Sequence, residues 1–107
     1  MVCVLCQFNP PTDPVLLGEY SRWFTGEGLE QIQAIEGLQE MRVFRNYSGD
    51  SPLVTAMVFF PDLRSALQMA DSDMWRTLVA NLTRWRCEDV MLTVLEPSPL
   101  VSQYERS

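Results

Sequence analysis

The order in which the hydrophobic period changes along the chain constrains the fold more than any single motif. Runs rich in β-branched and aromatic residues alternate with segments that repeat apolar residues every three or four positions, as strands and helices respectively do. Expected strands cover residues 2–8, 38–47, 53–60 and 90–95, and expected helical regions cover 14–36 and 62–85. The resulting order is β-α-β-β-α-β.

Turn and cap residues support these boundaries. Asp13 followed by Pro14 is typical of an N-cap and the first position of a helix. Gly26 and Gly28 are expected to stop or kink the first helical region, and Gly37 is placed to end it. The second region is expected to break near residues 71–73.

This order predicts a ferredoxin-like α+β domain in which two crossover helices cover one face of an antiparallel sheet. A sheet face left to solvent is expected to be polar. Residues 53–60 and 90–95 are apolar on both faces, so a second layer is needed. A second copy of the chain is the economical cover, which gives a homodimer with two sheets packed face to face. We expect one domain over residues 1–97 and a C-terminal tail over 98–107.

The basic residues exclude several kinds of chemistry. All eight are Arg, and the chain of 107 residues contains no Lys and no His. It therefore lacks the amine of a Schiff base or P-loop, the imidazole of a Ser-His-Asp triad, and the ligands of a His-bound haem or an HExxH zinc site. We expect no haem, flavin, pyridoxal phosphate or stoichiometric metal as a cofactor.

Charge and hydropathy limit the partners. The formal net charge is −6, which disfavours binding to nucleic acid or to an anionic membrane surface. No apolar run approaches the ~20 residues of a membrane span, and the first residues lack the basic region of a signal peptide. We expect a cytoplasmic protein.

The cysteines are expected to be small buried hydrophobic residues. Cys3 and Cys6 have the spacing of a redox or zinc half-site, but positions three apart on a strand point to opposite faces. Cys87 adds a third thiol, and zinc usually needs four ligands.

Residues 23–45 resemble a known group of proteins. The residues that carry the resemblance are Trp23, Phe24, Leu29, Ala34, Ile35, Gly37, Arg42 and Arg45. The segment is similar to the EthD-like members of the dimeric α+β barrel superfamily and, more distantly, to the antibiotic-biosynthesis-monooxygenase-like members. In the EthD-like pattern an acidic residue, His, Leu and Pro follow the aromatic pair. Here Glu27 and Leu29 keep their places, whereas Gly28 stands at the His position and Glu30 at the Pro position.

The resemblance does not extend to the haem-degrading branch of the superfamily. That branch combines an Asn at a strand end with a Trp and a haem-ligating His. Asn9 can supply the Asn, but Met69 and Val79 stand where the layout would place Trp and His. Haem degradation is therefore disfavoured.

The resemblance also implies a ligand cavity between the sheet and the helices of each subunit. Tyr20 and Trp23 are candidate ligand-binding residues, because each offers a flat apolar ring with one polar tip. Arg42 and Arg45 are candidates for an anionic group, and they point to opposite faces of one strand. Asn9 can donate to a carbonyl, although an Asn before two prolines is also a turn signal. Core packing, ion pairing and turn formation remain the alternatives for these residues.

Two functions are consistent with these features. The first is a cofactor-independent monooxygenase, isomerase or cyclase acting on an aromatic or polyketide-like substrate, with an apolar or aromatic anion as the ligand. The second is a non-catalytic ligand-binding or structural dimer that has lost the His of the family pattern. A closed cavity with polar groups beside Tyr20 and Trp23 would favour the enzyme, and a cavity filled by side chains would favour the dimer.

Overall fold

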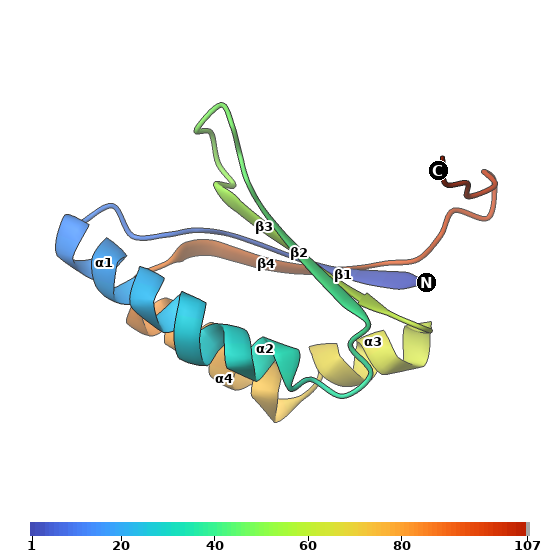
Figure 1. The fold of residues 1–107 in the computed structure, drawn as a ribbon, viewed down its shortest axis with the longest axis horizontal. Helices are drawn as coiled ribbons and strands as arrows, with labels where there is room; N and C mark the ends of the chain where they lie inside the picture. Colours follow the sequence, from blue (N-terminus) through green and yellow to red (C-terminus); the bar gives the residue numbers. More distant parts are fainter. Residues whose placement is uncertain (107) are drawn as a thin grey trace.

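Four antiparallel strands form one sheet, and the helices cover one of its faces (Figure 1). The protein is seen here in a computed structural model that describes residues 1–106. The strands are β1 (Val2–Asn9), β2 (Glu40–Arg45), β3 (Val54–Phe60) and β4 (Glu88–Leu95), and their order in the sheet is β2-β3-β1-β4. This arrangement confirms the predicted ferredoxin-like fold.

The first helical region does not stop at its glycines. Helix α1 (Pro14–Trp23) continues through the π turn η1 (Phe24–Gly28) into α2 (Leu29–Gln33). The backbone of Gly28 is helical, with φ −61° and ψ −45°. The region ends beyond α2, where Gly37 takes the left-handed φ of 85° that residues with a Cβ rarely adopt.

The second helical region breaks where the sequence predicts. Helix α3 (Leu63–Ala70) begins at Asp62, whose carboxylate accepts a hydrogen bond of 2.8 Å from the Ser65 N–H. Helix α4 (Asp73–Arg84) has Ser72 as its N-cap, so a new helix start lies shortly after the end of α3. Each cap satisfies an N–H that the first turn of a helix leaves without a partner.

The two faces of the sheet have different surroundings. On the face towards the helices, Val4 lies opposite Val58, and Cys6 lies opposite Ala56. With Phe8, Phe60 and Leu82 these residues form the core of the domain. The face away from the helices, here called the open face, carries the intervening residues of each strand. Its apolar members are Cys3, Leu5, Phe44, Met57, Phe59, Met91 and Leu95.

The chain leaves the sheet after β4. Residues 96–106 contain neither a helix nor a strand, and they run away from the body of the domain (Figure 1). Leu100 and Tyr104 in this tail are 92% and 85% exposed. Among residues 1–106, no helix has both the length and the apolar character that a membrane crossing needs.

Candidate functional site

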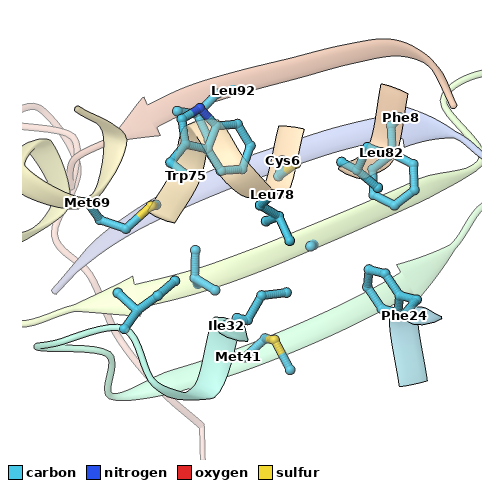
Figure 2. A pocket seen from close by; sticks show the side chains of 13 residues that line it. Cys6, Phe8, Phe24, Ile32, Met41, Met69, Trp75, Leu78, Leu82 and Leu92 are labelled. Atoms are coloured by element: carbon cyan, nitrogen blue, oxygen red, sulfur yellow. The ribbon is translucent and has the colours of Figure 1, made fainter. Parts of the chain in front are cut away.

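An apolar cavity of about 30 Å³ lies between the helices and the sheet (Figure 2). The sheet supplies its floor, η1 and α2 supply one wall, and α3 and α4 supply the other. The lining residues are Cys6, Phe8, Phe24, Ile32, Ile35, Met41, Ala56, Val58, Met69, Trp75, Leu78, Leu82 and Leu92.

The local sequence explains why a space remains here. Ala56 lies opposite Cys6 in the middle of the sheet, so two short side chains meet where the helices pass over it. On α4 the side chains of Trp75, Leu78 and Leu82 follow the helical spacing and face the sheet. The large residues therefore surround the space without filling it completely.

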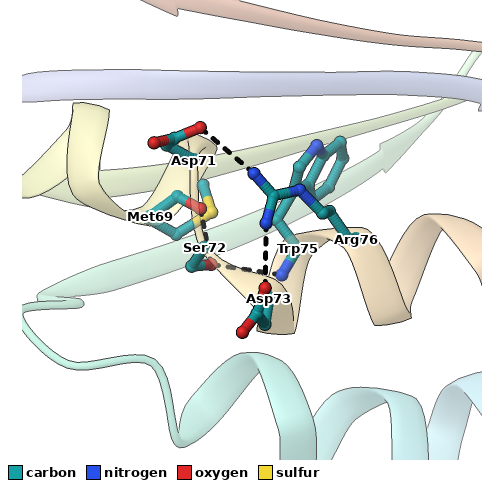
Figure 3. Close-up of polar contacts among 6 residues, drawn as sticks. All are labelled: Met69, Asp71, Ser72, Asp73, Trp75 and Arg76. Atoms are coloured by element: carbon teal, nitrogen blue, oxygen red, sulfur yellow. Dashed lines mark hydrogen bonds and ion pairs between the residues drawn. The ribbon is translucent and has the colours of Figure 1, made fainter.

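The α3–α4 junction fixes one wall of the cavity (Figure 3). The Ser72 hydroxyl donates to the Met69 carbonyl at 2.7 Å and accepts from the Trp75 N–H at 3.2 Å. Arg76 pairs with Asp73 at 2.8 Å and with Asp71 at 3.3 Å, both in solvent. Exposed ion pairs of this kind contribute little, so the Ser72 cap, which links the backbones of Met69 and Trp75, is the stronger polar interaction at this junction.

The lining of the cavity carries no charged side chain. Its heteroatoms are the Cys6 thiol, the thioethers of Met41 and Met69, and the indole nitrogen of Trp75. Burial raises the pKa of the Cys6 thiol to about 12, so this group stays protonated at neutral pH. The cavity therefore presents neither a general base nor a fixed positive charge to a ligand.

Tyr20 and Trp23 lie beside this cavity without lining it. They pack in an aromatic cluster with Phe8 and Phe24, whose ring centroids are 5.7 to 6.5 Å apart. Both side chains are buried. Burial, together with the nearby thiols of Cys87 and Cys6, raises the pKa of the Tyr20 hydroxyl above its usual range. The structure thus places these two rings in the core.

Arg42 and Arg45 lie on opposite sides of the sheet and outside the cavity. Arg42 is opposite Met57 on the open face and forms an ion pair with Glu40. Arg45 is opposite Val54, on the side of the helices, and is exposed. Arg45 is thus the arginine on the helix side of the sheet. Neither guanidinium is part of the cavity lining.

Asn9 connects the end of β1 to the β2–β3 loop and to the start of β4. Its side-chain oxygen accepts from the Leu53 N–H at 2.8 Å, and its nitrogen donates to Ser51 Oγ at 2.8 Å and to Asp89 Oδ2 at 3.2 Å. It lines an open groove of about 490 Å³ together with Asp13, Arg86 and other loop residues. Asn9 is thus separated from the apolar cavity and tied into the turns.

The cavity-lining residues of α3 and α4 were not among the sequence-based site candidates. The helical spacing of Trp75, Leu78 and Leu82 indicates a buried face, but spacing alone does not distinguish a cavity wall from a packed core. The short residues Ala56 and Cys6, which leave the space open, become neighbours through strand pairing 50 residues apart. Within residues 1–106, no three His, Cys, Asp or Glu side chains gather in a group that could hold a metal ion.

Comparison with known proteins supports the fold. No protein-family model and no curated protein sequence matches the chain. An EthD family protein from Bacillus halodurans has a similar structure, with a TM-score of 0.69, 17% identity, and coverage of 92% of this chain and 99% of the other.

Two further solved structures are similar. A protein from Deinococcus radiodurans, described as a candidate antibiotic biosynthesis monooxygenase, has a TM-score of 0.71, 10% identity, and coverage of 98% and 100%. A dimeric ferredoxin-like protein of unknown function from Jannaschia has a TM-score of 0.64, 16% identity, and coverage of 90% and 98%. The chain therefore has the ferredoxin-like fold that these proteins share. At these identities the likeness defines the fold alone.

Proposed function

We propose that the protein is a homodimeric α+β barrel that binds a small, neutral, apolar molecule between its helices and its sheet without transforming it. The observation that carries the proposal is the cavity lining, which lacks an acid, a base and a charge. A ligand there gains from leaving water and from contact with the walls. An anionic ligand would lose its hydration without gaining a partner.

The small size of the cavity disfavours a polyketide-sized substrate. A volume of about 30 Å³ is far below the ~150 Å³ that holds a molecule such as benzene. Binding therefore requires side chains to move aside, and the flexible thioethers of Met41 and Met69 are suited to this. A polyketide-sized substrate would require a much larger displacement of the helices.

The dimer is the second part of the proposal. The open face carries several large apolar side chains, among them Phe44 and Met91, which are more than half exposed. A neighbour with the same fold is described as dimeric. A second copy packed on the open face would remove these side chains from water.

A second candidate function is a cofactor-independent monooxygenase, isomerase or cyclase. It is favoured by the neighbour described as a candidate antibiotic biosynthesis monooxygenase. In such an enzyme the delocalised anion of the substrate would carry the chemistry, while the apolar walls exclude water and orient the ring.

Paired ligands test the proposal. Benzene and benzoate have the same ring, so the neutral compound should raise Tm and change the tryptophan emission while the acid should do neither. Ala56→Val, which adds volume to the cavity floor, should abolish the effect, whereas the exposed change Val15→Ala should not.

Each result separates the candidates. Binding of the acid in preference to the neutral compound would contradict the ligand class proposed here. If neither binds, a purely structural dimer is the better account. Oxygen consumption with formation of a new product from aromatic or polyketide-like compounds would establish the second candidate instead.

A further inference from the structure

The open face is apolar across its centre and nearly free of unbalanced charge. The register places Glu40 and Arg42 on it, and these pair with one another; it also places Glu88 at the end of the face, opposite Asn9. Apolar side chains from the four strands fill most of the remaining positions. The surface is therefore suited to an uncharged apolar occupant, and a second copy of the same face meets this requirement.

The sheet alone offers a small contact area. Four strands of this length, about 4.8 Å apart with a rise of about 3.3 Å per residue, cover a projected area on the order of 450 Å². Two such faces have a projected area on the order of 900 Å², and specific stable interfaces bury about 1,200 to 2,000 Å² of accessible surface. A dimer built on this face alone is therefore near the lower end of that range and gains from additional apolar surface.

The C-terminal tail has such surface and leaves it in solvent. Leu100, Val101 and Tyr104 are 92%, 65% and 85% exposed. Pro97 and Pro99 restrict the backbone and lack an N–H, which favours an extended segment. The tail follows Leu95, which lies on the open face. In Figure 1 the tail and the β2–β3 hairpin both rise from the sheet on the side away from the helices.

We propose that residues 96–104 of each chain pack against the second copy of the chain and complete the dimer interface. This inference rests on the homodimer proposed above. Leu100, Val101 and Tyr104 supply the apolar contacts that the sheet face lacks, and each chain provides them to the other. The tail is thus a strap on the partner subunit.

The alternative placement of the tail has the opposite consequence. A tail that folded back over the open face of its own chain would compete with the second copy for the same surface. Its removal would then strengthen the dimer. The effect of the tail on the dimer dissociation constant therefore distinguishes the two placements.

The experiment compares full-length protein with three variants by sedimentation equilibrium. One ends at Glu96, the second carries Leu100→Ser, Val101→Ser and Tyr104→Ser, and the matched control carries Ser102→Ala, Gln103→Ala and Glu105→Ala. These side chains are exposed, so the fold should be retained and far-UV circular dichroism should be unchanged. We expect the dimer Kd of the first two variants to rise by about tenfold or more, and that of the control to stay near the full-length value.

Each outcome bears on one of the two proposals. An unchanged Kd in the truncated and serine variants would overturn the proposed contact between the tail and the partner subunit, while the homodimer proposal would stand. A lower Kd would overturn the same contact in favour of a tail that covers its own sheet. A full-length protein that stays monomeric at all concentrations tested would overturn both.

Discussion

Gly28 lies against the indole of Trp23, so closely that a Cβ at position 28 would be 3.2 Å from Cζ2 and Cη2 of that ring. The π turn brings the glycine over a side chain five residues earlier. The sequence resemblance predicts that Gly28 stands where the EthD-like pattern has a His, and here the Trp23 ring occupies the space next to position 28. A side chain at position 28 and the buried indole of Trp23 therefore compete for the same space.

Gly28→His should consequently disturb the aromatic cluster. We expect a loss of about 1 to 3 kcal/mol in the free energy of unfolding, because the new side chain must displace a buried ring. Urea denaturation measures this loss. Gly26→Ala is the control, since nothing lies within 4 Å of a Cβ there, and it should be neutral or stabilising.

This competition has its own test. Trp23→Leu makes room, so Gly28→His should cost less in that background than in the wild type. An equal loss in the free energy of unfolding in the two backgrounds would show that the His does not compete with the indole. Catalytic turnover gained by Gly28→His with unchanged stability would support a decayed enzyme instead.

Met57→Asp should dissociate the proposed dimer. The register places Met57 in the middle of the open face, opposite Leu5 and Arg42. A second sheet would bury a carboxylate there and remove its hydration, and Arg42, which already pairs with Glu40, would compensate only in part, so association is opposed. Leu67→Asp is the control, because Leu67 is half exposed on α3. Sedimentation should show monomers for the first variant and dimers for the second, and a dimeric Met57→Asp protein would place the interface elsewhere.

The sequence predicts the fold better than the site for a physical reason. Strand and helix periods, and caps such as Asp13, are local signals, and they are sufficient to order the elements. The two-sided apolar strands also predict the open face. The cavity depends on Ala56 and Cys6 meeting across β1 and β3 beneath α4, which no local pattern encodes.

The aromatic residues illustrate the same limit. Tyr20 and Trp23 have the helical spacing of an inward face, and that face does point inward. Whether an inward ring lines a cavity or fills the core depends on the neighbouring side chains. The π turn, which keeps the chain helical past Gly26 and Gly28, also has no simple sequence signal.

Leu78→Ala should enlarge the cavity and strengthen its binding of a small hydrocarbon such as benzene. Leu78 is buried and lines the cavity, so its truncation should cost about 2 to 5 kcal/mol of stability. Benzene should restore part of the lost Tm by occupying the space. Val15→Ala, at an exposed position of α1, should change neither stability nor the response to benzene. A variant that benzene fails to stabilise would indicate that the helices collapse into the space.

Ser72→Ala should remove the N-cap of α4. The hydroxyl that accepts from the Trp75 N–H and donates to the Met69 carbonyl would be lost, at a cost of about 1 kcal/mol. Ser72→Asp keeps an acceptor at the cap and should retain most of the stability. Tryptophan emission should shift in the Ala variant, because the indole of Trp75 lies on the first turn of α4, which begins at the cap. Equal stability of the Ala and Asp variants would show that the cap is unimportant.

The Cys6 thiol should make the protein less stable as the solution becomes alkaline. Burial raises its pKa from 9.0 to about 12, so between these values the unfolded chain releases the proton while the folded chain keeps it. Its contribution to stability is complete below pH 9 and is lost as the pH rises towards 12, with a slope of about 1.4 kcal/mol per pH unit. Cys87, whose pKa burial raises to about 11, acts in the same direction. Urea denaturation in reductant at several pH values from 8 to about 10.5 should therefore give a shallower decline for Cys6→Ala than for wild type. An identical decline in both proteins would show that the Cys6 thiol is hydrated in the folded state.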